Sequence, residues 1–160
     1  AIQPNTKIIY IVTPTNPGLD VLDIGYLSDI AKKHQIILIV DNCFATPYLQ
    51  KPVSFGADLF IHSSTKLIDG QGRVLGGLIV GRQDLINEIR SFFRNSGSTL
   101  SPFSAWVLSK SLETLAVRLD RHCENALELA KNLENHPKIS QVKYPFLPNH
   151  PQCKIAKKNA

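Results

Sequence analysis

The apolar run Ile-Ile-Leu-Ile-Val-Asp at residues 36–41 constrains the fold of this chain more than any other segment. The run is too continuously apolar for a strand with one face in water, so it predicts a central strand of a parallel sheet, covered on both faces. Further apolar runs at residues 7–12, 59–63 and 75–81 predict three more strands. A helical pattern capped by Asp23 separates the first two strands. The chain is therefore expected to form an α/β layer with a mainly parallel sheet and flanking helices.

A long helical pattern dominates the second half of the chain. Apolar residues recur at helical spacing from Leu108 to Leu133, and Pro137 ends the pattern. A helix of roughly thirty residues exceeds the usual length in globular proteins, so we expect this element to join two domains. Residues 1–105 are accordingly assigned to a large domain, and residues 106–160 to the linking helix and the start of a second domain.

Smaller features of the same half lead to further expectations. Residues 85–93 carry one apolar face and predict an amphipathic helix. Phe103 and Trp106 stand at helical spacing and are expected to lie in the core. Residues 139–144 are expected to begin a strand of the second domain, and the basic, polar tail at 154–160 to add no closing element.

Composition narrows the class of protein. With 160 residues, 43% of them hydrophobic, the chain can bury a substantial core. No apolar stretch approaches the ~20 residues of a membrane span. The three cysteines lie far apart, which predicts neither a disulfide framework nor a metal site and fits a reducing cytoplasm. Basic residues are scattered rather than striped with aromatics, so we expect no nucleic-acid partner.

The two ends of the sequence suggest a fragment of a longer protein. The chain starts at Ala1, contains no methionine, and enters a strand-like run almost at once. We therefore expect the net charge of +5 to describe this piece and not the whole protein.

Polar residues follow three of the predicted strands. Asn16 lies past the first strand, Asp41 ends the second, and His62-Ser63-Ser64-Thr65-Lys66 follow the third. Ligands of such sheets bind outside the carboxyl ends of the strands. An amine, a carboxylate and two hydroxyls are the groups that hold pyridoxal 5'-phosphate. The lysine can form a Schiff base, the carboxylate can pair with the ring nitrogen, and the hydroxyls can donate to the phosphate.

Lys66 and Asp41 also have ordinary structural explanations. A lysine after a strand is usually solvated at the surface, and Asp41 could cap the turn at Asn42. An aspartate at the end of an apolar strand is costly to bury without a partner, however. A pyridinium nitrogen is such a partner, and the carboxylate would raise its proton affinity by roughly one to three units.

Ser63 and Thr65 could likewise be ordinary turn hydroxyls. Because they are two residues apart, both can point to one side of an extended segment, with Ser64 facing away. His62 alternates with Ser63 and is interpreted as structural. The glycine-rich stretch at 69–77 contains no nucleotide-binding motif and is interpreted as tight turns.

Several motifs together resemble one family, the trans-sulfuration enzymes of cysteine and methionine metabolism, which depend on pyridoxal phosphate. The resemblance covers nearly the whole chain. The matching segments are Thr-Pro-Thr-Asn-Pro at 13–17, Val-Asp-Asn-Cys-Phe-Ala-Thr-Pro at 40–47, Gly-Ala-Asp at 56–58, His-Ser-Ser-Thr-Lys at 62–66, Gly-Gly at 76–77, Leu-Ser-Pro-Phe at 100–103, Leu-Glu-Thr-Leu at 112–115 and Tyr-Pro-Phe-Leu-Pro-Asn-His-Pro at 144–151. Asp-Gly-Gln-Gly-Arg at 69–73 looks most like the homoserine-ester sulfhydrylases of the family.

The resemblance implies a fold-type I architecture, with a large cofactor domain followed by a smaller C-terminal α/β domain. It also implies a homotetramer built from dimers with shared active sites. By position, Lys66 would form the Schiff base and move protons, and Asp41 would pair with the ring nitrogen. Ser63 and Thr65 would bind the phosphate, and Asn16 would lie near the phenolic oxygen of the ring.

The implied reaction is the replacement of the γ-ester of O-succinyl- or O-acetylhomoserine by sulfide, which gives homocysteine. A cystathionine γ-synthase or a γ- or β-lyase of the same family is an alternative, and a non-catalytic structural or interaction piece is an alternative of another class. The sequence departs from the family pattern at Val12, often glutamate, at Cys43, commonly threonine, and at Leu67, usually tyrosine. Residues that the family supplies from outside this stretch are missing, so these 160 residues alone are expected to be inactive.

Overall fold

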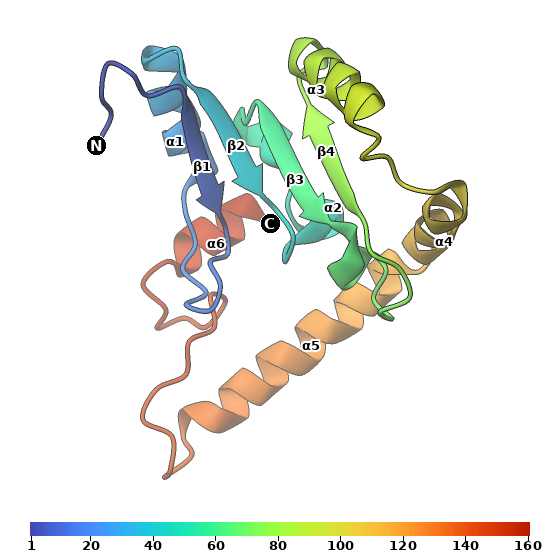
Figure 1. Cartoon of the computed structure of the whole chain (residues 1–160). Coiled ribbons are helices and arrows are strands. Elements are labelled where there is room, and N and C mark those ends of the chain that lie inside the picture. Colours follow the sequence, from blue (N-terminus) through green and yellow to red (C-terminus); the bar gives the residue numbers. More distant parts are fainter.

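A four-stranded sheet forms the centre of the computed structural model, which describes all 160 residues (Figure 1). The strands lie side by side in chain order, as β1 (Ile8–Val12), β2 (Ile37–Asp41), β3 (Leu59–Ser63) and β4 (Gly77–Gly81). The first three are parallel, and β4 runs antiparallel to β3. The predicted α/β class with a mainly parallel sheet is therefore confirmed, although the fourth strand begins later than the predicted residue 75.

Six α-helices accompany the sheet. They are α1 (Ile24–Lys33), α2 (Thr46–Leu49), α3 (Gln83–Ser96), α4 (Pro102–Leu112), α5 (Leu115–Glu134) and α6 (Cys153–Asn159), and a 3-10 turn spans Pro52–Phe55. Asp23 caps α1 as predicted, because its Oδ1 accepts the backbone N–H of Tyr26 at 3.1 Å. The amphipathic helix predicted over residues 85–93 is also present, as part of α3. None of the helices is long and apolar enough to cross a membrane.

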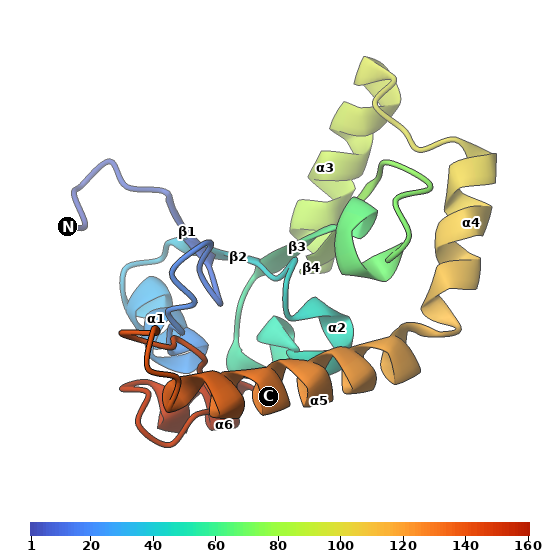
Figure 2. The same cartoon turned by 90° about the horizontal axis from the view of Figure 1, so that it is seen from below.

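The core lies between the sheet and α1. Ile24 and Ala31 of α1 pack against Leu38 and Val40 of β2, and Ala57 completes this buried cluster. Figure 2 shows α1, α2, α5 and α6 on the same side of the sheet. On the opposite side of the sheet, β1 and β2 carry no helix (Figure 2).

The prediction that β2 is covered on both faces is wrong for this chain. Leu38 and Val40 are completely buried, whereas Ile37 and Ile39, which point to the other face, are only half-buried. On the neighbouring strand β1, Tyr10 is exposed on the surface. The continuous apolar run therefore leaves one apolar face of the sheet open (Figure 2).

The single long helix predicted from Leu108 to Leu133 is also wrong, because the chain bends between α4 and α5 (Figure 1). The carbonyl of Ser111 accepts hydrogen bonds from the Thr114 hydroxyl at 3.3 Å and from Nη2 of Arg118 at 3.1 Å. The same carbonyl accepts the backbone N–H of Thr114 at 3.3 Å, so a tight turn and two side chains bond this end group of α4 where the regular helical ladder stops. The assignment of residues 106–160 to a linking helix and a second domain stays a prediction.

The C-terminal segment differs from both expectations for it. Residues 139–144 form no strand, since no other strand lies beside them to supply hydrogen bonds. The basic tail, expected to add no closing element, forms α6, whose Ala156 is buried. Lys158 pairs with Asp23 at 2.8 Å, and Nδ2 of Asn159 donates to the carbonyl of Leu22 at 2.9 Å. These contacts attach α6 to the start of α1.

Phe103 and Trp106 do not lie in the core as predicted. Their side chains are 69% and 58% exposed, and their ring centroids are 6.0 Å apart. The buried side of α4 is formed by Val107, Leu108 and Ser111 instead. Helical spacing identified an apolar stripe on this helix, but it could not show which stripe faces the turn that follows β3.

Candidate functional site

A cavity of about 640 Å³ lies at the carboxyl ends of β1, β2 and β3. It brings together four of the five predicted site residues: Asn16, Asp41, Ser63 and Lys66. Parallel pairing explains the grouping, because the three strands end at the same edge of the sheet (Figure 1). The volume is typical of a site for a small molecule.

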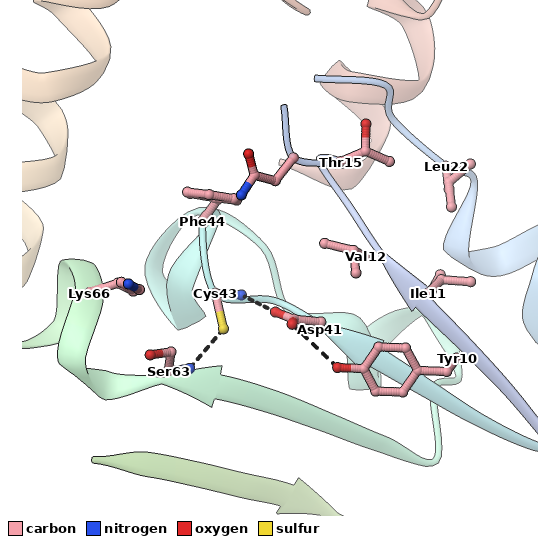
Figure 3. A pocket seen from close by; sticks show the side chains of 11 residues that line it. Tyr10, Ile11, Val12, Thr15, Leu22, Asp41, Cys43, Phe44, Ser63 and Lys66 are labelled. Atoms are coloured by element: carbon pink, nitrogen blue, oxygen red, sulfur yellow. Dashed lines mark hydrogen bonds between the residues drawn. The ribbon is translucent and has the colours of Figure 1, made fainter. Parts of the chain in front are cut away.

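Asp41 lies at the centre of the cavity wall (Figure 3). Its Oδ1 accepts the backbone N–H of Cys43 at 3.0 Å, and its Oδ2 accepts the hydroxyl of Tyr10 at 3.3 Å. Burial, together with the negative charge of Asp41, raises the pKa of the Tyr10 phenol, so that the phenol keeps the proton that it donates. The carboxylate is thus oriented by two donors and remains half-buried at the cavity surface.

Cys43 connects the two central strands at this edge. Its Sγ atom accepts the backbone N–H of Ser63 (Figure 3). Burial and a hydrogen bond with Asp41 raise the pKa of the Cys43 thiol to about 11, against the opposing effects of the Ser63 N–H and of Lys66. Cys43 is therefore a neutral thiol at neutral pH and a structural link between β2 and β3.

A buried amide network supports Asp41 from behind. Asn42 is completely buried, and its Nδ2 donates to the carbonyls of Thr46 at 3.0 Å and of Gln50 at 2.9 Å. Nε2 of Gln50 donates in turn to Oδ1 of Asn42 at 2.7 Å and to the carbonyl of Thr13 at 3.2 Å. The network joins the segments that follow β1 and β2, and so fixes the position of both strand ends.

Lys66 approaches the cavity from the turn that follows β3 (Figure 3). This π-helical turn spans Ser64–Ile68, and Lys66 departs from helical geometry within it, with φ −82° and ψ −118°. The side chain is exposed and forms none of the ion pairs of the chain. Its amine is therefore available to a ligand in the cavity.

Thr65 is the predicted site residue that the structure does not bring to the cavity. Its hydroxyl donates to the carbonyl of Gly76 at 3.2 Å and accepts the N–H of Gly76 at 2.9 Å. Ser63 and Thr65 do not share one side of an extended segment as predicted, because the strand ends at Ser63 and a helical turn begins at Ser64. Ser64 was predicted to face away, and it does not line the cavity. Its buried hydroxyl has no hydrogen-bond partner.

His62 lies away from the cavity and is buried, in agreement with a structural role. Its ring meets the Phe60 ring edge-on, with centroids 5.3 Å apart, and neither ring nitrogen has a hydrogen-bond partner. Burial lowers the pKa of His62, so the imidazole is neutral at neutral pH.

Tyr10, Asn42 and Gln50 support the site and were not predicted from the sequence. Tyr10 stands two residues before Val12, which pairs with Asp41 across the sheet, so strand alternation could have placed the phenol on the face of the carboxylate. Nothing local in the sequence indicated the contacts of Asn42 and Gln50, because both depend on how the segment after β2 folds back on itself.

The donor set fits pyridoxal 5'-phosphate. One cavity holds a free amine on Lys66, an oriented carboxylate on Asp41 and a hydroxyl on Ser63 that makes no hydrogen bond within the chain. These groups match the aldehyde, the ring nitrogen and the phosphate of that cofactor in turn. Lys66, Asp41 and Ser63 thus offer an amine, a carboxylate and a hydroxyl at separate places around one cavity.

Comparisons with known proteins agree with this chemistry. The family model described as "Cys/Met metabolism PLP-dependent enzyme" matches residues 1–160. The chain is 48% identical to the O-succinylhomoserine sulfhydrylase of Pseudomonas aeruginosa over 99% of its own length and 39% of the relative's. It is 46% identical to the cystathionine gamma-lyase of Bacillus subtilis over 98% of its own length and 42% of the relative's.

A solved structure shows the same fold. The cystathionine gamma-lyase from Lactobacillus plantarum, complexed with L-serine, matches with a TM-score of 0.94 at 39% identity, over 99% of this chain and 42% of that one. The chain therefore spans about two fifths of the length of the curated relatives and of the structure that it matches. Its fold is that of part of a fold-type I pyridoxal-phosphate enzyme. The chain belongs to the family of Cys/Met metabolism PLP-dependent enzymes.

Proposed function

We propose that the whole protein is a homoserine-ester sulfhydrylase that depends on pyridoxal phosphate. In this reaction sulfide replaces the γ-ester group of O-succinyl- or O-acetylhomoserine, which gives homocysteine and releases succinate or acetate. The observation that carries the proposal is the shared cavity of Lys66, Asp41 and Ser63. The 48% identity to an O-succinylhomoserine sulfhydrylase supports the choice of reaction within the family.

Each residue of the site has a proposed role. Lys66 would hold the cofactor covalently, Asp41 would pair with its ring nitrogen, and Ser63 would donate to its phosphate. Thr65 remains a second candidate for the phosphate, through its position in the sequence, and Asn16 a candidate for the phenolic oxygen. When bound, the cofactor supplies an electron sink for the negative charge that develops beside the substrate's amino group.

The chain's own groups would carry the proton transfers. The Lys66 amine, once freed, would take the proton from the α carbon of the substrate and return it at a neighbouring carbon. The Asp41 carboxylate, oriented by Cys43 and Tyr10, would keep the ring nitrogen protonated by its opposite charge. The neutral Cys43 thiol adds no second negative charge next to Asp41.

A γ-lyase is the second candidate, because the Bacillus subtilis cystathionine gamma-lyase is 46% identical to the chain. The segment Asp-Gly-Gln-Gly-Arg at 69–73 favours the sulfhydrylase, since its sequence resembles that group. In this chain the segment is held together by an ion pair between Asp69 and Arg73 at 3.0 Å.

The assembly and location of the protein are part of the proposal. We expect a cytoplasmic homotetramer whose dimers share active sites. The exposed ring pair of Phe103 and Trp106 supports an association of this kind, because large aromatic side chains are enriched at protein interfaces. The division at residues 105 and 106 into cofactor and C-terminal domains belongs to the same proposal.

Steady-state kinetics of the full-length protein test the reaction. The proposal predicts that homocysteine forms from O-succinyl- or O-acetylhomoserine and sulfide faster than cystathionine is cleaved. Lys66→Arg should lower kcat at least about a hundredfold, because it removes the acid–base group. Lys51→Arg, a matched change at an exposed lysine, should leave kcat unchanged. Faster cleavage of cystathionine would favour the γ-lyase.

A further inference from the structure

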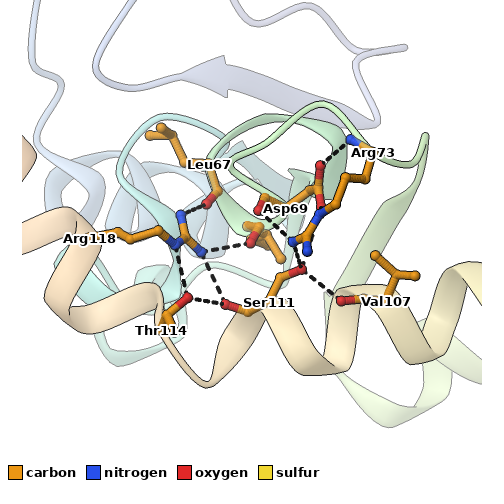
Figure 4. Close-up of polar contacts among 8 residues, drawn as sticks. Leu67, Asp69, Arg73, Val107, Ser111, Thr114 and Arg118 are labelled. Atoms are coloured by element: carbon orange, nitrogen blue, oxygen red, sulfur yellow. Dashed lines mark hydrogen bonds and ion pairs between the residues drawn. The ribbon is translucent and has the colours of Figure 1, made fainter.

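We propose that Arg118 is a positioning residue for Lys66, an inference that rests on the proposed function of that lysine. Arg118 lies in the first turn of α5, far from Lys66 in the sequence. Its Nη1 donates to the carbonyl of Leu67 at 2.8 Å, and its Nη2 donates to the carbonyl of Ile68 at 3.0 Å (Figure 4). One guanidinium group therefore holds the two peptide carbonyls that directly follow Lys66.

The same guanidinium is anchored at the junction of α4 and α5. Its Nε donates to the hydroxyl of Thr114 at 3.1 Å, and its Nη2 also donates to the carbonyl of Ser111 at 3.1 Å. Because α4 ends before α5 begins, the carbonyl of Ser111 accepts Nη2 of Arg118 in addition to the backbone N–H of Thr114 (Figure 4). The break between the helices thus orients Arg118 toward the turn Ser64–Ile68, which we call the lysine turn.

The backbone of the lysine turn needs such an external donor. Lys66 has non-helical dihedral angles, so the regular hydrogen-bond ladder is interrupted within Ser64–Ile68. Ile68 is buried, and a buried carbonyl without a partner costs free energy comparable to a lost hydrogen bond. The planar fork of an arginine can bind two adjacent carbonyls at once, whereas the ammonium group of a lysine acts as a single point.

A second contact holds the following segment to the same junction. Asp69 is completely buried and accepts the backbone N–H of Arg73 at 2.7 Å and its Nε at 3.0 Å. Nη2 of Arg73 continues to the hydroxyl of Ser111 at 2.7 Å. Arg118 therefore binds the lysine turn and the carbonyl of Ser111, while Arg73 binds Asp69, directly after the turn, and the hydroxyl of Ser111 (Figure 4).

Gly70 makes room for the guanidinium of Arg118. It adopts a φ of +71°, and a Cβ added there would overlap Nη1 of Arg118. The amide of Gly70 donates to the carbonyl of Lys66 at 2.8 Å, so the glycine also closes the turn. Lys66 thus begins a short stretch in which three successive carbonyls, those of Lys66, Leu67 and Ile68, are all bonded.

The experiment compares Arg118→Lys and Arg118→Gln in the full-length protein with Arg121→Lys and Arg121→Gln. Arg121 stands on the same helix but is exposed and pairs only with Glu124 at 3.6 Å. Thr114→Val removes the acceptor of Nε and the hydroxyl bond to the Ser111 carbonyl but keeps the guanidinium, so it is a milder variant if Arg118→Gln does not fold. Its effects should lie between those of the wild type and those of Arg118→Lys.

Two measurements are made on each protein. Amide hydrogen exchange of residues 67–70 in the cofactor-free protein reports the turn itself, and it should become about tenfold faster in the Arg118 variants. Absorbance titrations with pyridoxal phosphate report its covalent attachment to Lys66. The apparent Kd for pyridoxal phosphate should rise at least about tenfold, because charge-assisted bonds that orient the lysine are lost. The pH at which the absorbance of the bound cofactor is half-changed should also shift.

The outcomes separate the two claims. Faster exchange with a higher Kd in the Arg118 variants, and neither change in the Arg121 variants, would support the positioning role. Unchanged exchange, or faster exchange with the Kd and pH midpoint of the wild type, would overturn it. A wild-type protein that never attaches the cofactor to Lys66 would overturn the proposed function, and the positioning role with it, whatever the exchange rates are.

Discussion

The Sγ atom of Cys43 accepts a hydrogen bond from the backbone N–H of Ser63 and thereby connects the carboxyl ends of β2 and β3. This contact lies between two groups of opposite charge in the cavity, the carboxylate of Asp41 and the amine of Lys66. Burial and the hydrogen bond with Asp41 outweigh the lysine and raise the pKa of the thiol to about 11. Cys43 is therefore an uncharged side chain in a cavity that also holds the carboxylate of Asp41 and the amine of Lys66.

The raised pKa predicts an unreactive thiol. Because the thiolate is the nucleophile, Cys43 in the full-length, cofactor-free protein should react with iodoacetamide at least about tenfold more slowly at pH 8 than free cysteine does. Its rate should keep rising between pH 8 and pH 10. Timed alkylation followed by peptide mass spectrometry measures both quantities, with the urea-unfolded protein as control. A rate that levels off near the ordinary cysteine pKa of about 8.5 would contradict the assignment.

The buried amide of Asn42 predicts a large loss of stability in Asn42→Asp. The change removes both donors from the carbonyls of Thr46 and Gln50 and places a charge in a completely buried position. We expect the free energy of unfolding to fall by about 2–4 kcal/mol, measured by urea denaturation of the full-length protein. Asn87→Asp, the same change at an exposed position of α3, should cost less than about 0.5 kcal/mol. Equal losses of unfolding free energy in Asn42→Asp and Asn87→Asp would show that the amide network does not stabilise the protein.

The ion pair of Asp69 predicts a specific pH dependence of stability. Burial alone would raise the pKa of Asp69, but the hydrogen bonds and charge of Arg73 outweigh it and lower the pKa. The unfolded chain therefore takes up this proton at higher pH than the folded protein. The stabilisation is complete above the unfolded value of about 3.9 and is lost as the pH falls through the lower folded value.

Asp69→Asn should accordingly be less stable than the wild type at pH 7 and should lose less further stability between pH 5 and pH 3. Urea unfolding across this range measures the difference, provided that the protein refolds reversibly. Asp29→Asn is the matched control, because Asp29 is exposed and forms no ion pair. Parallel stability curves for the wild type and Asp69→Asn would contradict the assigned pKa direction.

Local patterns were sufficient for the elements that build the edge of the sheet. The apolar run ending at Asp41 identified β2, the capping aspartate Asp23 identified the start of α1, and the run ending at Ser63 identified β3. Since parallel strands end at one edge, these local features also predicted that Asn16, Asp41, Ser63 and Lys66 meet in one place, which the cavity confirms.

The failed predictions concern features that strand alternation and helical spacing do not encode. The break before α5 depends on Arg118 and Thr114 bonding the carbonyl of Ser111, and helical periodicity carries no sign of it. Thr65 lies outside the cavity because the strand ends at Ser63, two residues before the position to which strand alternation would have to extend. The exposure of Trp106 depends on which side of α4 meets the turn that follows β3, which is a property of the assembled fold.

The most direct test of the account is peptide mapping of the full-length protein after borohydride reduction in the presence of pyridoxal phosphate. The shared cavity of Lys66 and Asp41 predicts a phosphopyridoxyl group on Lys66 in the wild type. The cofactor should be bound much more weakly in Asp41→Ala. A label on another lysine, or no label at all in the folded protein, would contradict the central claim.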